Sequence, residues 1–382
     1  MMLLTRAAAT GVAAVVLFAS PRASLHASEA GRLMRVATSA QALDAALEHA
    51  MREMMPQVTR RQRKMAVGLQ RRLELTPEET VRLILADTEA LLDNPHELEP
   101  ALDELQALVG LSNEELEKVV QRCPKVLGLV SVPEKQSLLS SRLDALRSVI
   151  GLEDAEIRTI VKRFPKLLLY DLTESGRGTE SPMAKAKELR ALLALDKQEL
   201  RKLVTKHPQV ITLEMEANVK PTIELLQQML QADRDDSRRL VMRYPQVLGL
   251  SVEANLRPKL SFLLEEEGLG LTPADALHAV LKTPLALGAS LSKSLRPNLD
   301  AYREVLPHGT DVCSIVRERG LRWLTCNAES RTIPRLREAA LANISPHDVI
   351  RQVRMTDAQW NQWLTAEEGF NQGDRQSRSE AQ

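Results

Sequence analysis

Five segments of the chain superimpose on a proline and share one pattern of apolar positions. Successive prolines are 41, 43, 37 and 39 residues apart: Pro124, Pro165, Pro208, Pro245 and Pro284. Positions four, five and eight residues before the proline are mostly apolar, and the position at minus four is always valine: Val120, Val161, Val204, Val241 and Val280. Because these positions share one face of an α-helix, the pattern predicts an amphipathic helix with this face buried. The recurrence predicts stacked helical repeats.

The proline is expected to end each of these helices, because it lacks an N–H and disfavours the α region for the residue before it. A short apolar pair follows, as in Val126-Leu127, and predicts one tight 3₁₀ turn. In three repeats a second helix is then marked by a second proline: Asn218-Val219-Lys220-Pro221, Asn255-Leu256-Arg257-Pro258 and Ser294-Leu295-Arg296-Pro297. The Asn or Ser before that proline is expected to cap this second helix.

Atypical copies flank the five repeats, as expected where an end repeat faces water. Upstream, Ala86–Leu91 has Thr88 at the proline position, and downstream, Arg319–Leu324 follows Pro284 by 36 residues. The repeats are therefore expected over residues 73–355, after one helical stretch over 41–72. Residues 1–40 are interpreted as a targeting segment and leader, and 356–382 as the end of a C-terminal helix with a disordered tail.

These repeats resemble the mitochondrial transcription termination factor (mTERF) family. The resemblance rests on a short helix followed by P-x-[VLI]-[LI]-x-[LY] and a second helix opened by N-[VL]-[KR]-P, and it covers about residues 73–325. It implies an all-α superhelical solenoid of helix–turn–helix repeats, right- or left-handed, curved with a concave basic surface. It also implies that this surface holds duplex DNA or, in some members, structured RNA.

Charge changes the picture, because 51 basic and 51 acidic residues give no net charge and a phosphate-binding protein is usually basic. A fixed basic row, however, lies two residues before the five prolines: Arg122, Arg163, Lys206, Arg243 and Lys282. Further candidate nucleic-acid-binding residues are Lys162, Lys202, Arg239, Lys220, Arg257 and Arg296. Acids gather at the opposite helix ends, as in Glu114-Glu115. Stacking would align the row into one stripe, although the helix dipole alone, at about 0.3–1 kcal/mol per charge, also favours this arrangement.

Aromatic residues are only 3% of the chain, which favours a duplex backbone over single strands held by base stacking. There is no Gly-rich phosphate loop, HExxH or GxSxG, so no enzyme and no cofactor are expected. Cys123, Cys313 and Cys326 lie far apart without CxxC, so no metal site is expected. The predicted function is that of a monomeric, nucleic-acid-binding regulator of organellar gene expression, acting in transcription, its termination or RNA maturation. The alternative is a protein-interaction scaffold.

The first 28 residues contain no acid and are rich in Ala, Ser and Thr. Their apolar run, Gly11–Ala19, is far too short to span a bilayer, so no membrane segment is expected. The composition favours import into a mitochondrion or a plastid and does not separate the two. Secretion is the rival interpretation, and it conflicts with cysteines that suit a reducing compartment.

Overall fold

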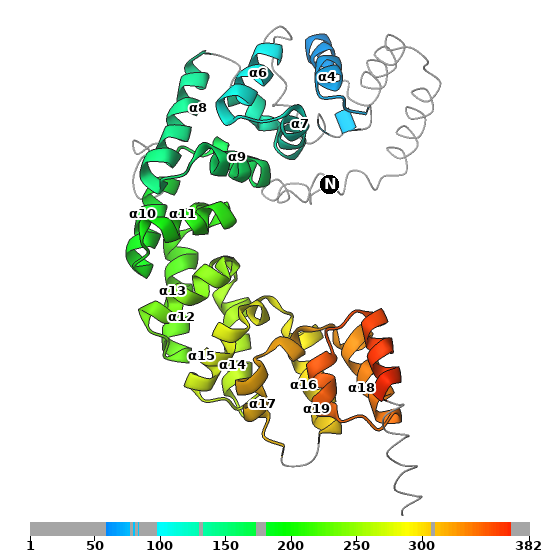
Figure 1. The fold of residues 1–382 in the computed structure, drawn as a ribbon. Helices are drawn as coiled ribbons and strands as arrows, with labels where there is room; N and C mark the ends of the chain where they lie inside the picture. Colours follow the sequence, from blue (N-terminus) through cyan, green and yellow to red (C-terminus); the bar gives the residue numbers. More distant parts are fainter. Residues whose placement is uncertain are drawn as a thin grey trace, which may run out of the picture. The chain divides into compact units, whose positions relative to one another are not determined.

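The computed structural model describes residues 59–76, 79–80, 83, 98–129, 133–172, 181–306 and 310–367 (Figure 1). Every regular element in these ranges is helical, which confirms the predicted all-α repeat fold. The leader, residues 41–58, the copy at Thr88 and the tail after 367 lie outside the described residues. Handedness, curvature and a concave basic surface remain predictions. Within the described ranges, no helix has both the length and the apolarity needed to cross a bilayer.

Each repeat begins with a helix that ends two residues before the proline, followed by a 3₁₀ turn. The first helices are α7 (Asn113–Arg122), α9 (Asp154–Arg163), α11 (Lys197–Lys206), α13 (Arg234–Arg243), α15 (Pro273–Lys282) and α17 (Val312–Arg319). The turns are η4 (Pro124–Leu129), η6 (Pro165–Leu169), η8 (Pro208–Thr212), η10 (Pro245–Gly249), η12 (Pro284–Gly288) and η14 (Arg322–Thr325). The predicted helix ends and turns are confirmed at all five prolines.

A second helix completes each repeat. These helices are α8 (Pro133–Ala145), α10 (Pro182–Leu193), α12 (Lys220–Leu230), α14 (Arg257–Leu264), α16 (Arg296–Val305) and α18 (Ile333–Leu341). One π-helical turn precedes each of the last four: η9 (Met215–Val219), η11 (Val252–Leu256), η13 (Leu291–Leu295) and η15 (Ala328–Thr332); another, η5 (Leu146–Ile150), follows α8. The flanking helices are α4 (Arg60–Arg72), α6 (Leu98–Val109), α19 (Pro346–Gln352) and a last one over 357–367.

The prediction that Asn or Ser just before the second proline caps the second helix was wrong. Because a π-helical turn precedes the second proline, the helical run begins several residues before the predicted Asn or Ser. Its N-terminal cap is therefore the residue just before the π-helical turn. The side chains of Ser251, Ser290 and Asn327 accept hydrogen bonds from backbone N–H groups three residues later. Asn255 lies inside the turn and accepts a hydrogen bond from the Lys259 ammonium instead.

The sixth repeat is shifted by one residue from the expected register. The π-turn cap lies six residues after Pro245 and Pro284, and Asn327 lies six residues after Leu321, so Leu321 takes the proline position. The helix before it, α17, ends at Arg319, and its C-terminal cap is Gly320, whose positive φ of 68° favours glycine and ends the helix without a proline. Consequently Arg319 lies two residues before the proline position and continues the basic row.

The described residues divide into two compact units: those before 188 together with 204–212, and 188–203 together with those from 213 onward. In the first unit α7 packs on α9 and η4 on η6. In the second, α13 packs on α15 and α15 on α17, and the 3₁₀ turns pack likewise. The five valines of the predicted stripe are all 0% exposed, which confirms that this face is the core of the repeats.

Buried polar side chains tie second helices to the turn of the next repeat. Arg142 donates from Nη1 to the carbonyl of Leu168 at 2.6 Å. Lys259 and Asn298 donate in the same way to the next turn, Asn298 from Nδ2 to the Leu324 carbonyl at 2.9 Å. Lys259 and Asn298 each directly follow a second proline, so a polar residue after that proline is a sequence signal for this contact.

Candidate nucleic-acid interface

All five side chains of the basic row are exposed, and each belongs to the last residue of a first helix. The last carbonyls of a helix lack partners within it and give this end a partial negative charge. A basic side chain here is therefore stabilised by its own helix, whatever else it contacts.

Three members of the row also reach the next repeat. Arg122 donates from Nη1 to the carbonyl of Lys162 at 2.6 Å in the first unit. In the second unit Arg243 donates to the Leu281 carbonyl, and Lys282 donates to the Glu318 carbonyl at 2.6 Å. In each case the acceptor is a free carbonyl near the end of the following first helix. These side chains thus cap their neighbour, a contact that the sequence analysis did not predict.

The other two members of the row make no such contact. Arg163 and Lys206 form no side-chain hydrogen bond with the described residues. Burial lowers the pKa of His207, and the charges of Lys206 and Arg163 lower it further, so both cations lie near this ring in the first unit.

A hydrogen bond to a carbonyl leaves the charge of the donor in place. A guanidinium has five N–H donors and an ammonium has three, and the capping contacts use one or two of them. The row therefore keeps both positive charge and free donors at the surface, which are the requirements for contact with phosphate.

Four of the remaining candidate residues are instead paired with carboxylates. The pairs are Lys162–Glu115 at 2.8 Å, Arg239–Asp236 at 2.5 Å, Lys220–Glu188 at 2.8 Å and Arg257–Glu253 at 2.8 Å. Because an adjacent carboxylate compensates each charge, these four are weaker candidates for phosphate contact than the row. Of the last two candidates, Lys202 has no ion-pair partner among the described residues, and the Arg296 guanidinium lies 5.7 Å from the centre of the Phe262 ring.

The acids that start the first helices form ion pairs with the next repeat. Glu115 accepts from Lys162 at 2.8 Å and from Arg158 at 2.6 Å. The Lys162 ammonium, the Ser112 backbone N–H and Arg158 together lower the pKa of Glu115 to about 2.

The second unit repeats this arrangement. Glu199 accepts from Arg238 at 2.8 Å and Asp275 from Arg317 at 2.7 Å. Arg317, and then the Thr272 hydroxyl, lower the pKa of Asp275. Glu115, Glu199 and Asp275 are therefore compensated by bases of the following first helix and not by the residues of the basic row.

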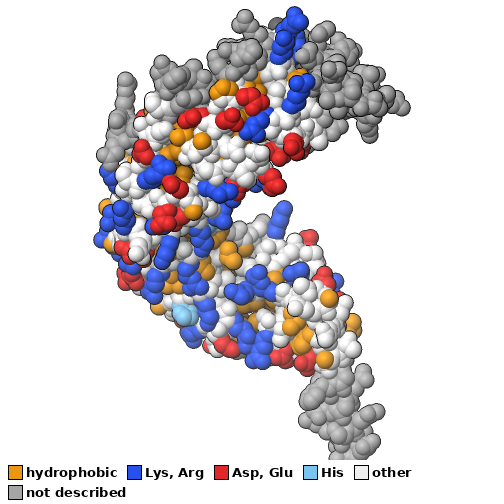
Figure 2. Space-filling view, turned by 45° about the horizontal axis from the view of Figure 1, so that its top comes forward, with side chains coloured by type: hydrophobic (Ala, Val, Ile, Leu, Met, Phe, Trp, Pro, Cys, Tyr) orange, Lys and Arg blue, Asp and Glu red, His pale blue; other side chains and the backbone are white. Residues whose placement is uncertain are grey.

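Two predicted side chains from α13 and one from α11 come together in a groove of the second unit. The groove has a volume of about 500 Å³, and four bases line it: Lys202, Arg239, Arg243 and Arg238, the last of which the sequence did not indicate as a site residue. Two acids line it as well: Glu199, which pairs with Arg238, and Asp235, which pairs with Arg239. Figure 2 shows Lys and Arg side chains gathered over this unit, with Asp and Glu among them. Because these acids compensate Arg238 and Arg239, Lys202 and Arg243 are the bases of this groove that remain available to an anionic backbone.

The position just before the proline holds half-buried or buried side chains. Phe164, His207 and Tyr244 are half-buried, and Cys123 and Thr283 are buried. This supports the interpretation of this position as packing and not as a ladder of exposed rings for base stacking.

The model of the mTERF family matches residues 176–328. This segment contains the repeats of Pro208, Pro245 and Pro284. The repeats of Pro124 and Pro165 begin before it and have the same order of first helix, 3₁₀ turn and second helix. No curated protein matches the chain.

Proposed function

We propose that this chain, whose residues 176–328 match the model of the mTERF family, is a member of that family that binds double-stranded DNA as a monomer and regulates organellar gene expression. Family membership indicates nucleic-acid binding and a role in organellar gene expression. The preference for duplex over structured RNA, and action in transcription, its termination or RNA maturation within a mitochondrion or plastid, are parts of the proposal. The protein acts by binding and not by catalysis.

The observation that carries the proposal is the row of exposed, uncompensated bases at one fixed place in successive repeats. Within the first unit α7 and α9 pack together, and within the second α13, α15 and α17 do so. Neighbouring helix ends therefore present Arg122 with Arg163, and Arg243 with Lys282. Arg319 continues the row but is half-buried and paired with Glu318. Each such end offers one cation to one phosphate.

The backbone of a duplex fits these features better than unpaired bases do. Proteins that hold single strands stack the bases on exposed aromatic rings. Here Tyr302 and Trp323 are buried and pack edge to face, with their ring centroids 4.8 Å apart, and Tyr244 is half-buried. Phosphate contacts position a protein on nucleic acid without reading its sequence, so the row supplies affinity and not the choice of site.

The test is the salt dependence of duplex binding by the full chain. If each of the five residues of the row neutralises one phosphate, the logarithm of the affinity should fall with the logarithm of salt concentration at a slope of about −4 to −5. Single-stranded DNA and hairpin RNA of equal length serve as comparisons and should bind more weakly. If duplex binding is absent or nearly independent of salt, the row only caps helices and the protein-interaction scaffold becomes the better hypothesis.

A further inference from the structure

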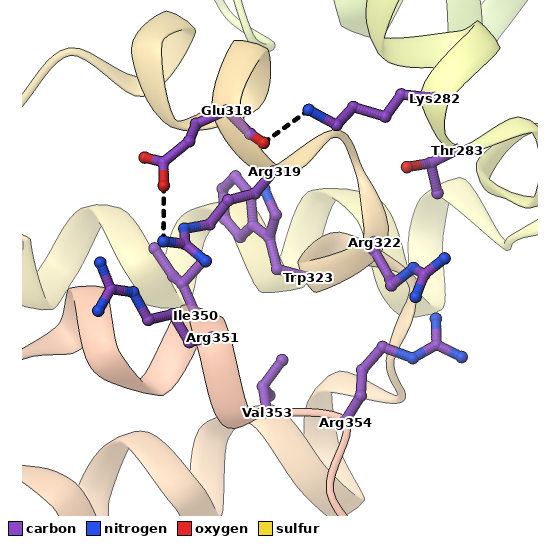
Figure 3. Close-up of a pocket in the computed structure, with 10 residues that line it drawn as sticks. All are labelled: Lys282, Thr283, Glu318, Arg319, Arg322, Trp323, Ile350, Arg351, Val353 and Arg354. Atoms are coloured by element: carbon purple, nitrogen blue, oxygen red, sulfur yellow. Dashed lines mark hydrogen bonds and ion pairs between the residues drawn. The ribbon is translucent and has the colours of Figure 1, made fainter.

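A pocket in the second unit gathers more positive charge than its own residues compensate. It has a volume of about 380 Å³ and lies where the end of α17, the turn η14 and the segment after α19 meet (Figure 3). Five bases and one acid line it: Lys282, Arg319, Arg322, Arg351, Arg354 and Glu318. Arg319 pairs with Glu318, and Arg351 pairs with Asp348 outside the lining at 3.6 Å. Three bases, Lys282, Arg322 and Arg354, thus remain without a carboxylate partner among the described residues.

Two of these guanidinium groups point toward one another without a carboxylate between them. Figure 3 shows Arg322 and Arg354 converging from η14 and from the segment after α19. The Arg322 guanidinium has no hydrogen-bond or ion-pair partner among the described residues, and the Arg354 guanidinium donates to the neutral Thr325 hydroxyl at 3.0 Å. The one lining acid, Glu318, pairs with Arg319 at 2.8 Å. Like charges held this close repel each other unless an anion lies between them.

The chemistry of the pocket selects among anions. Trp323 lies in its wall, but the ring is 1% exposed and its Nε1 donates to the Gly320 carbonyl at 3.0 Å, so no aromatic face is available for stacking. Recognition must therefore come from charge and from N–H donors. Planar guanidinium groups match the oxygens of phosphate, and three uncompensated positive charges favour an anion with more than one negative charge.

We propose that this pocket binds a phosphate group that carries two or more negative charges, such as a terminal phosphate or a pyrophosphate. Arg322 and Arg354 bind its oxygens, and Lys282 adds a third uncompensated charge. Arg319 and Arg351, each paired with a carboxylate, contribute N–H donors at the edge of the pocket. Lys282 and Arg319 also belong to the basic row and its continuation, so the pocket lies beside the proposed duplex surface. The phosphate either ends a nucleic-acid strand, a case that rests on the proposed function, or belongs to a free nucleotide or pyrophosphate.

The experiment measures pyrophosphate binding to the full chain by calorimetry and by the rise in melting temperature. The variants are Arg322→Ala, Arg354→Ala and, as a matched control, Arg337→Ala, an exposed base on α18 outside the pocket. We expect one site, weakened about tenfold to a hundredfold by either pocket variant and unchanged in the control, since one charge-assisted hydrogen bond has about this worth. Arg322→Lys should restore part of the affinity. No binding by the wild type, or equal binding by all variants, overturns the proposal.

Duplexes with a 5′-phosphate or a 5′-hydroxyl distinguish the source of the phosphate. A preference for the 5′-phosphate that Arg322→Ala removes assigns the pocket to strand ends. Equal affinity for both duplexes, with pyrophosphate binding intact, assigns it to a free phosphate compound. A chain that binds pyrophosphate but no duplex supports the pocket and contradicts the proposed function. A chain that binds duplex but no pyrophosphate supports the proposed function and contradicts the pocket proposal.

Discussion

Replacing Arg122 by alanine is expected to lower the free energy of unfolding by about 1–2 kcal/mol. The variant loses the 2.6 Å hydrogen bond from Nη1 to the Lys162 carbonyl, which lies on the exposed side of the repeats. A net contribution of about 0.5–1.5 kcal/mol is usual for such a bond. The variant also loses a positive charge at the C-terminal end of α7, for about 0.3–1 kcal/mol more.

Arg163→Ala is the matched control, because Arg163 occupies the same position in the next repeat and is equally exposed. It has no capping hydrogen bond to a described residue, so only the dipole contribution of about 0.3–1 kcal/mol should be lost. Urea unfolding followed by far-ultraviolet circular dichroism measures both variants. Equal destabilisation by the two, or none by Arg122→Ala, would contradict the proposed capping between repeats.

The same pair separates stability from binding. A carbonyl partner does not neutralise Arg122, so both variants should weaken duplex binding to a similar extent although only one strongly destabilises the fold. If binding followed stability instead, so that Arg163→Ala bound like the wild type, phosphate contact by the row would be excluded.

Three further changes test the repeat architecture. Val241 is 0% exposed, so Val241→Ala should cost about 1–3 kcal/mol in urea unfolding, and a loss within error would refute the repeat register. Asn298→Leu leaves the carbonyls of Leu324 and Cys326 without their amide donor and should cost about 1–3 kcal/mol net; an unchanged unfolding midpoint would show that these contacts do not hold the repeats together. The pKa of Glu115 is lowered from 4.5 to about 2, so its stabilisation is present above pH 4.5 and is lost as the pH falls from there to about 2. Glu115→Gln should therefore reduce the loss of stability between pH 4.5 and 2, measured as the free energy of unfolding against pH. The same loss in variant and wild type would show that the ion pairs of Glu115 do not cause it.

Local features of the repeat were predictable from the sequence because each depends on a few neighbouring residues. A proline such as Pro245 fixes where a helix stops, and Val241 marks the buried face four residues earlier. The cap of the second helix was mispredicted because a π-helical turn moves the start of the helical run away from Asn255 and back to Ser251. Spacing from the proline alone does not reveal such a turn.

The partners of the charged residues could not be predicted, because they depend on how one repeat stacks on the next. Arg122 and Lys162 both appeared as exposed bases in the sequence. The structure gives Arg122 a neutral carbonyl and Lys162 the carboxylate of Glu115, which separates a strong candidate for phosphate contact from a weak one. Arg319 was not selected because Gly320, and not a proline, ends its helix, which shifted the expected register by one residue.

The central claim is that uncompensated bases at the ends of the first helices contact duplex phosphates. The most direct measurement compares the salt slope of duplex binding between two double variants. The first carries both Arg163→Ala and Arg243→Ala, and the control carries both Arg147→Ala and Arg257→Ala. The control removes the same charge, one base from each unit, but each of its residues is paired with a carboxylate. We expect a slope flattened by about two units in the first double variant, alike for every duplex sequence, and nearly unchanged in the control. A slope that stays at the wild-type value in both, or falls equally in both, would contradict the central claim.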